Sequence, residues 1–163
     1  MPHIHDKYDF TVSMFVVHPT KDLICLHWHK KLGLWNNFGG HVELDQDPLE
    51  CLEQEMLEET GLKPDEYEIL QTYDGPKNIG VKEMPNPFGL HMWKYGDLEH
   101  YHIDLPYIIR VKHTNFSPHE GESLKIEWFD QEKIQEFFAD GKIDQGTKGI
   151  CDWIFEKNHF GRS

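Results

Sequence analysis

The sequence predicts a single domain, residues 1–163, of the α/β or α+β class, with a mixed sheet and one central helix between two groups of strands. Three observations predict it. A chain of 163 residues suits one domain with a sizeable core. Hydrophobic residues at 38% and aromatic residues at 13% are too many for a disordered chain. The expected elements also occur in the order strands, helix, strands and helices, which favours a mixed fold.

The first third of the chain predicts strands and a hairpin. Alternating polarity and a high content of β-branched and aromatic residues indicate strands at residues 9–17, 23–29 and 34–38. The segment "HPTKD" between the first two is typical of a turn. The first two strands should therefore form a hairpin.

Residues 48–60 predict the central helix, and both of its ends are marked. Asp47 can cap the N-terminus, Pro48 suits the first helical position, and Glu50 completes an arrangement like a capping box. Gly61 can end the helix in the left-handed conformation. An apolar stripe should pack against the sheet, and it comprises Leu49, Leu52 and Met56.

The remainder of the chain predicts strands at 67–73, 101–112 and 124–129, then helices at 131–138 and 145–157. Residues 74–99 show no period and are rich in glycine and proline, so we expect a long loop, which in compact domains is usually functional or disordered. Trp93 and Tyr95 in this loop, with Phe88, could bind substrate by stacking on a base or sugar. The alternative is that these rings fix the loop to the body of the protein.

Composition restricts the class of partner. A formal net charge of −13 argues against a nucleic-acid polymer, whose binding depends on Lys and Arg. No apolar run approaches the roughly 20 residues that span a bilayer, and no secretory signal is visible. Three widely spaced cysteines suit reduced thiols, so we expect a cytoplasmic protein without a membrane partner. An anionic small molecule would need a local cation to bind here.

The predicted helix carries an unusual density of acids. No Lys or Arg occurs between Lys31 and Lys63, and three glutamates at helical spacing share one face: Glu55, Glu58 and Glu59. Like charges at this spacing destabilise a helix by about 0.2–0.5 kcal/mol per pair. Converging carboxylates suit a hard divalent cation such as Mg²⁺. The alternative is a solvated acidic face, as charge runs usually are.

The segment "GGHVELDQDPLECLEQEMLEETGL" gives these acids a family context. It resembles the Nudix box, with the pattern G-x5-E-x7-R-E-U-x-E-E-x-G-U, where U is aliphatic. Gly40 matches the first glycine, the three helix glutamates match the glutamates that follow the arginine position, and Gly61 matches the last glycine. Two positions depart from the pattern, because Gln46 replaces a glutamate and Gln54 replaces the arginine that is expected to hold a helix glutamate.

The resemblance implies a Nudix α/β/α sandwich that hydrolyses a diphosphate bond in a nucleoside diphosphate linked to another moiety. It implies Mg²⁺ or Mn²⁺ as the cofactor, bound by the three helix glutamates and the Gly40 carbonyl. Some relatives take the general base from a later loop, for which Glu120 is the first candidate and Glu122 the second, although both could be ordinary surface acids. His41 follows the glycine pair and could touch a phosphate. Related proteins are often homodimers.

Two other functions remain open. A Nudix-fold sensor that binds a nucleotide without cleaving it would account for Gln46 and Gln54. A metalloprotein unrelated to diphosphate chemistry could use residues that alternate along a predicted strand, namely His100, His102 and Asp104. Two histidines and a carboxylate are a recognised ligand set for iron or zinc.

Overall fold

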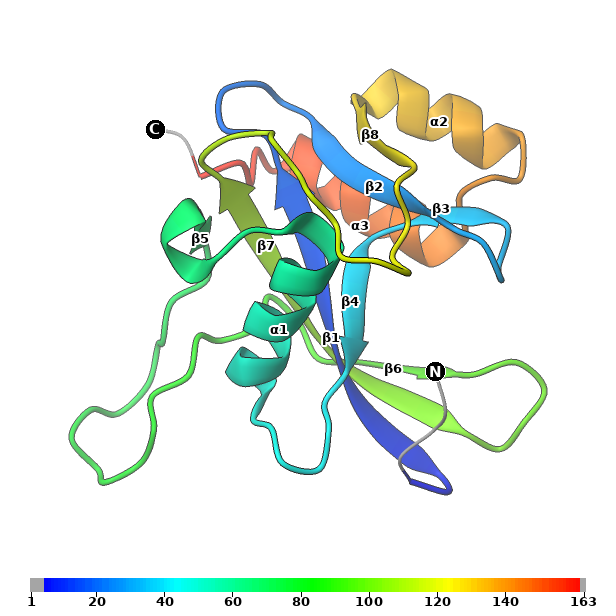
Figure 1. Cartoon of the computed structure of the whole chain (residues 1–163). Coiled ribbons are helices and arrows are strands. Elements are labelled where there is room, and N and C mark those ends of the chain that lie inside the picture. Colours follow the sequence, from blue (N-terminus) through cyan, green and yellow to red (C-terminus); the bar gives the residue numbers. More distant parts are fainter. Residues whose placement is uncertain (1–4, 162–163) are drawn as a thin grey trace.

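One mixed sheet of eight strands organises the computed structural model, which describes residues 5–161 (Figure 1). Its main path runs β3-β2-β1-β7-β5, and β4, β6 and β8 pair with β1, β7 and β2 respectively. The strands are β1 (Tyr8–Val17), β2 (Ile24–His29), β3 (Leu34–Asn36), β4 (Phe38–His41), β5 (Tyr67–Ile69), β6 (His91–Lys94), β7 (Tyr101–Val111) and β8 (Ile126–Phe129).

Strand β1 is the centre of this sheet. On one edge it pairs in parallel with β7, in a register from Tyr8 opposite Tyr101 to Val17 opposite Arg110. At its C-terminal end it pairs in antiparallel fashion with β2, and nearer its N-terminus it pairs with β4. The pairing with β7 brings together residues more than 90 positions apart in sequence.

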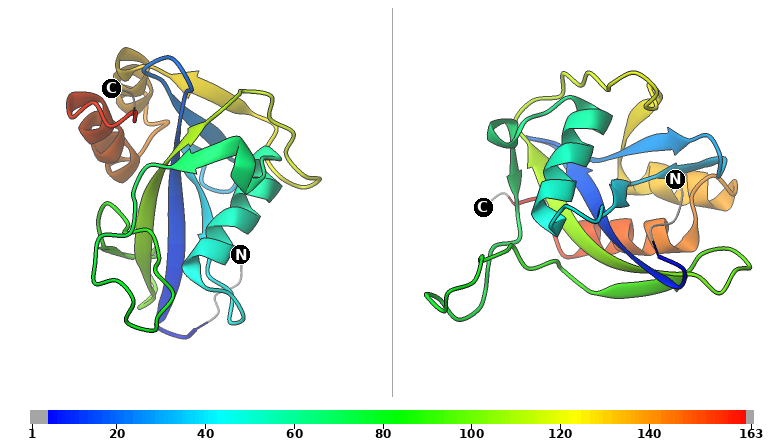
Figure 2. Two further views of the ribbon diagram at one scale, coloured as in Figure 1. Left: turned by 90° about the vertical axis from the view of Figure 1, so that its left-hand side faces the viewer. Right: turned by 60° about the horizontal axis from the view of Figure 1, so that its bottom comes forward.

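Helices cover both faces of the sheet, as the two views in Figure 2 show. Alternate side chains of β1 point to opposite faces, so Met14 packs in the core beneath α1 (Pro48–Thr60). Its neighbour Phe15 packs in a second core with residues of α2 (Gln131–Ala139) and α3 (Gln145–Glu156). The predicted α/β/α sandwich with a mixed sheet is therefore confirmed.

The central helix begins and ends where the sequence predicts. The Asp47 carboxylate accepts a hydrogen bond of 2.9 Å from the Glu50 amide, and Pro48 occupies the first turn. Gly61 adopts φ 78° and its N–H donates to the Leu57 carbonyl at 2.9 Å. Within residues 5–161, no helix is long and apolar enough to cross a membrane.

Two regions differ from the prediction. The predicted strand at 34–38 extends into two short strands, β3 and β4, with a break at Asn37. The predicted loop at 74–99 contains β6, whose residues are all exposed, so burial imposes no alternation that a sequence pattern could reveal. Phe88 fixes this segment to the body, since its ring lies 4.9 Å from that of Trp153 and 6.1 Å from that of Phe15.

Candidate active site

The glycine pair of β4 lies directly against the acidic face of α1. The Gly39 amide donates a hydrogen bond of 2.9 Å to the Glu59 carboxylate. A Cβ added to Gly40 would lie 2.2 Å from the Glu55 Oε1 atom, so only glycine allows this carboxylate to sit so close to the backbone. Gly39 has φ 154°, and a Cβ there would collide with the Val12 carbonyl at 2.2 Å.

Glu59 is the most deeply placed member of the acidic cluster. Its side chain is 6% exposed, and Oε2 lies 3.4 Å from the Nε2 of His27. Burial, followed by the charge of Glu55, raises the pKa of Glu59 well above its usual range, while the Gly39 amide opposes that shift. Burial also lowers the pKa of His27 to about 4, so the imidazole is neutral near pH 7 and provides no countercharge.

Glu55 is held in an environment that disfavours its charge. Burial, followed by the charge of Glu58 and then that of Glu122, raises the pKa of Glu55 to about 8. Binding a cation would relieve the repulsion that neighbouring carboxylates exert on Glu55 and Glu59. The donor set consists of oxygens, which fits Mg²⁺ or Mn²⁺, and Glu55, Glu58, Glu59 and the Gly40 carbonyl would hold the ion.

Cys51 lies one turn before Glu55, and its buried thiol donates hydrogen bonds to carbonyl groups of β4. Its thiol lies 3.3 Å from the His41 carbonyl and 3.9 Å from the Gly40 carbonyl. Burial, then the charge of Glu55, raises the pKa of Cys51 to about 12. The sulfur therefore stays protonated and packs between α1 and β4 without acting as a nucleophile.

The two glutamines that depart from the Nudix pattern form a hydrogen-bonded chain. The Gln46 amide donates to the Gln54 carbonyl oxygen, and the Gln54 amide donates to the Glu58 carboxylate at 2.8 Å. Gln54 thus holds a helix glutamate in place, which is the part that the resemblance assigns to arginine. Gln46 in turn fixes the amide of Gln54, so the sequence departures leave Glu58 oriented.

The loop after β7 brings a further carboxylate to the cluster. The Ser117 amide donates to the Thr60 carbonyl and the His119 amide to the Glu58 carbonyl, both at 2.8 Å, so this loop satisfies carbonyls at the end of α1. The charge of Glu122 raises the pKa values of both Glu55 and Glu59. Glu120 lies in the same loop and is exposed. Of the two loop glutamates, Glu122 is therefore the one whose charge acts on the helix glutamates. A catalytic role for Glu120 stays a prediction.

Comparison with known proteins agrees with this geometry. The family model for the NUDIX domain matches residues 7–153, which is most of the chain. The chain belongs to the Nudix family.

Solved Nudix structures match the chain over nearly its whole length. A hydrolase of the NUDIX family from Clostridium perfringens is 28% identical, with a TM-score of 0.70 over 88% of this chain and 93% of that one. The E. coli dihydroneopterin triphosphate pyrophosphohydrolase is 9% identical, with a TM-score of 0.63 over 90% and 96%. The C. elegans Ap4A hydrolase is 12% identical, with a TM-score of 0.60 over 92% and 97%. The last two share the Nudix fold.

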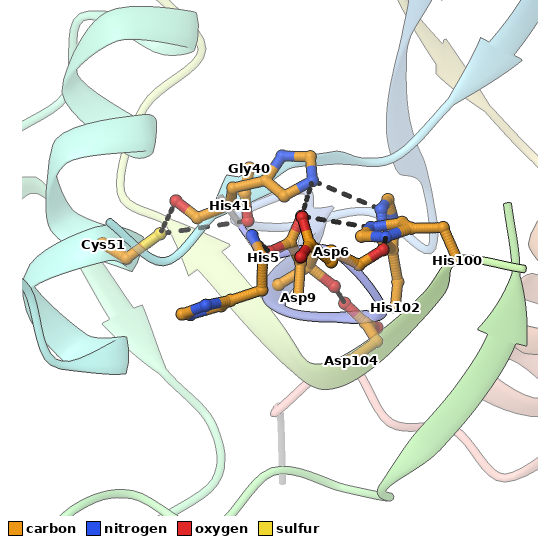
Figure 3. A network of polar contacts seen from close by, with 10 residues as sticks. His5, Asp6, Asp9, Gly40, His41, Cys51, His100, His102 and Asp104 are labelled. Carbon is orange, nitrogen blue, oxygen red and sulfur yellow. Dashed lines mark hydrogen bonds and ion pairs between the residues drawn. The ribbon is translucent and has the colours of Figure 1, made fainter. Parts of the chain in front are cut away.

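The three residues predicted to bind substrate gather away from the Nudix acidic cluster. The Nε2 of His41 lies 3.3 Å from the Nε2 of His102, and these two rings meet edge to face (Figure 3). The rings of Trp93 and Tyr95 also lie against His102, at centroid distances of 4.5 Å and 5.2 Å. Both aromatic side chains are more than a third exposed, so substrate contact stays a prediction for all three residues.

The histidine and aspartate set predicted on β7 has a different third member. Asp104 accepts hydrogen bonds from Thr11 at 2.7 Å and Ser13 at 2.9 Å. The carboxylate that joins His100 and His102 is that of Asp9, from β1. Asp9 lies opposite His102 in the parallel register of β1 and β7, a long-range pairing that no local sequence pattern reveals. The expectation for Asp104 is therefore corrected to Asp9.

Proposed function

We propose that this Nudix protein hydrolyses a diphosphate bond in a nucleoside diphosphate linked to another moiety, using Mg²⁺ or Mn²⁺. The observation that carries the proposal is that Glu55 and Glu59 lie against the glycine pair of β4, while the charge of Glu58 acts on both. Enzymes of this family generally use a divalent metal ion. A chain of net charge −13 would otherwise repel a diphosphate.

Each residue of the cluster has a distinct part in this proposal. The bound ion would supply charge neutralisation of the diphosphate and polarisation of the phosphorus under attack. Glu59 is fixed by the Gly39 amide, and Glu58 is oriented by Gln54, so two of the three carboxylates are positioned before substrate arrives. Glu55 occupies the space that the missing side chain of Gly40 leaves, which brings carboxylate and backbone carbonyl to one region.

The loop glutamates are the candidates for the general base, the group that accepts a proton from the attacking water. Glu122 is the one whose charge acts on Glu55 and Glu59, and its own pKa is raised by burial and then by Glu58. A carboxylate with a raised pKa is a better base near neutral pH. Glu120, which the sequence ranks first, is exposed and becomes the second candidate. Substitution of the true base should lower kcat while leaving metal affinity nearly unchanged.

A substrate panel tests the proposal. Nucleoside diphosphate sugars, ADP-ribose, dinucleoside polyphosphates, oxidised nucleoside triphosphates and dihydroneopterin triphosphate would each be incubated with Mg²⁺ or Mn²⁺. Turnover of at least one is expected, with loss of activity in Glu58→Gln and Glu59→Gln. Glu53→Gln, which removes a charge from the same helix outside the cluster, serves as the matched control and should keep activity. Turnover that survives both glutamate changes would reject the proposal.

A sensor that binds nucleotide without hydrolysis is the second candidate function. Its supporting observation is that Gln46 and Gln54 remove two charged groups of the family motif. The hydrogen bond from Gln54 to Glu58 favours the enzyme, because it keeps a proposed metal ligand in place. A thermal-shift screen with the same compounds separates the two: a ligand that raises the melting temperature but yields no product supports the sensor. The net charge of −13 argues against a nucleic-acid polymer as partner. Light scattering would test the expected homodimer.

A further inference from the structure

We propose that Asp9, His100 and His102 bind one zinc ion, with His41 as the fourth ligand, at a site separate from the acidic cluster of α1. The first three residues each offer one ligand atom, and these atoms lie within 4.8 Å of one another. The set combines imidazole nitrogens with a carboxylate, which suits zinc and other borderline transition metals better than Mg²⁺. The proposal is independent of the hydrolytic function.

Three separations between ligand atoms are close to those around a tetrahedral ion. Asp9 Oδ2 lies 3.1 Å from His100 Nε2 and 3.6 Å from His41 Nε2, and His41 Nε2 lies 3.3 Å from His102 Nε2. A zinc ion with bonds of about 2.0–2.1 Å places neighbouring ligand atoms roughly 3.3–3.4 Å apart at the corners of a tetrahedron. The other separations among Asp9, His100 and His102 are at most 4.8 Å, so the imidazole rings would have to move towards a bound ion.

The contacts of His100 leave room for a metal ion at its Nε2. Its Nδ1 lies 3.1 Å from the Asp6 carbonyl, which can only accept, so Nδ1 carries the hydrogen. In the neutral ring the lone pair of Nε2 then faces the Asp9 carboxylate at 3.1 Å. Either a second proton or a metal ion must lie between these two acceptors. A backbone carbonyl on the far ring nitrogen is the usual partner of a zinc-bound histidine.

Burial and neighbouring groups also suit a metal site. Asp9 is 1% exposed, and His100 and His102 are each 3% exposed, so a charge placed here is shielded from water. The His5 amide donates to Asp9 Oδ1 at 2.8 Å, which orients the carboxylate so that Oδ2 faces the histidines (Figure 3). The ring of Trp93 covers His102 from β6. A site with four protein ligands and such cover is typical of structural zinc.

The site lies behind the acidic cluster, across strand β4. Successive residues of a strand point to opposite faces, and Gly40 faces Glu55 of α1 while His41 faces His102. A zinc ion held partly by His41 would therefore tie β4 to β1 and β7 at the residue that follows the glycine pair. Zinc binding should therefore make the backbone at Gly39 and Gly40 more rigid.

Metal titration of the full-length protein tests the site. Protein freed of metal by a chelator and then dialysed would be titrated with Zn²⁺ in a calorimeter and with Co²⁺ in a spectrophotometer. We expect one Zn²⁺ per chain, the intense visible absorption of tetrahedral Co²⁺, and displacement of Co²⁺ by Zn²⁺. At a Zn²⁺ concentration about 100 times the Kd, the melting temperature should rise by roughly 5–10 °C.

Variants assign the ion to this site. Asp9→Asn and His102→Gln should each weaken Zn²⁺ binding by more than the roughly 10–100-fold typical of residues that merely hydrogen-bond a ligand. His113→Gln is the matched control, because His113 also lies 3.1 Å from a carboxylate, that of Glu66, but on the surface. Glu58→Gln should leave Zn²⁺ binding unchanged, which separates this site from the hydrolytic one.

Three results would overturn the proposal. The first is failure of the wild-type protein to take up Zn²⁺ or Co²⁺, which is decisive even where a variant does not fold. The second is a Co²⁺ spectrum without the intensity of tetrahedral coordination. The third is Zn²⁺ binding that survives Asp9→Asn and His102→Gln, with circular dichroism confirming that both variants are folded. Any of these results would mean that the histidines and Asp9 form a hydrogen-bonded network without a metal ion.

Discussion

Gln46 and Gln54 depart from the family motif as a pair, and they touch. Gln46 replaces a negative residue and Gln54 a positive one, so the two changes together leave the net charge of the motif unaltered. Their side-chain amides hydrogen-bond to each other, and Gln54 reaches Glu58 at 2.8 Å. A neutral pair thus occupies the two motif positions at which the family pattern has charged residues. Because the glutamine amide donates without charge, it orients Glu58 but offsets none of its repulsion from Glu55.

Truncation of this glutamine pair should weaken metal binding without unfolding the protein. We expect Gln54→Ala to reduce Mg²⁺ affinity or kcat by about 10-fold, the lower end of the range for residues that hydrogen-bond a metal ligand. Gln46→Ala should cost less, because it acts only through Gln54. A double-mutant cycle on Mg²⁺ affinity measures the coupling. Strictly additive effects would show that the two glutamines do not work as a unit.

The two glycines of β4 should respond differently to alanine. In Gly40→Ala the new methyl meets only the end of the flexible Glu55 side chain, so the fold should survive while Mg²⁺ binding falls. In Gly39→Ala the methyl meets the Val12 backbone at a φ of 154°, so the cost should appear as a lower melting temperature. Thermal unfolding and Mg²⁺ calorimetry on both variants check this. An unaltered Mg²⁺ affinity in Gly40→Ala would contradict the proposed position of Glu55.

At the scale of elements, local signals predicted α1 and its acidic face, whereas long-range pairing determined the rest of the site. The cap at Asp47 and the terminus at Gly61 depend on neighbouring residues, so the sequence places the helix at 48–60, as observed. The exposed strand β6 and the short strand β4 owe their form to pairing with β7 and β1, which leaves no period in the sequence. Asp9 was missed for the same reason, since only the β1–β7 register brings it to His102.

The N-terminal cap of α1 offers a test at this scale. Asp47 both caps the helix and pairs with Lys82 at 2.5 Å. Asp47→Ala should lower the free energy of unfolding by about 1 kcal/mol through the lost cap. Asp47→Asn keeps the cap and loses only the exposed ion pair, so it should cost about 0–1 kcal/mol. Chemical denaturation of both variants measures these values. Equal losses in the two would mean that the ion pair, and not the cap, stabilises the helix.

The whole molecule carries a formal charge of −13 and concentrates part of it against one face of its sheet. Burial and the charges of neighbouring carboxylates keep Glu55 and Glu59 less acidic than free glutamates, so ionising them destabilises the metal-free fold. The carboxylates proposed to bind the metal ion are therefore also the ones that affect stability. A bound divalent ion would offset this destabilisation. Without the ion, the free energy of unfolding should depend on pH.

In a chelator, the protein should therefore become less stable as the pH rises from 6.5 to 8. The folded-state pKa of Glu55 is about 8, against 4.5 for an unperturbed glutamate, and that of Glu59 is also raised, so the folded state binds more protons in this window and its stability falls. His27, with a folded pKa of about 4, acts in the opposite sense but only below about pH 6.5. The expected loss is about 1–3 kcal/mol over this interval, measured by denaturant titration.

Glu55→Gln should flatten this dependence of stability on pH. Saturating Mg²⁺ should reverse it, because the ion binds the deprotonated carboxylates. A metal-free protein whose stability stays level or rises across this window would show that these carboxylates are ionised and solvated in the fold.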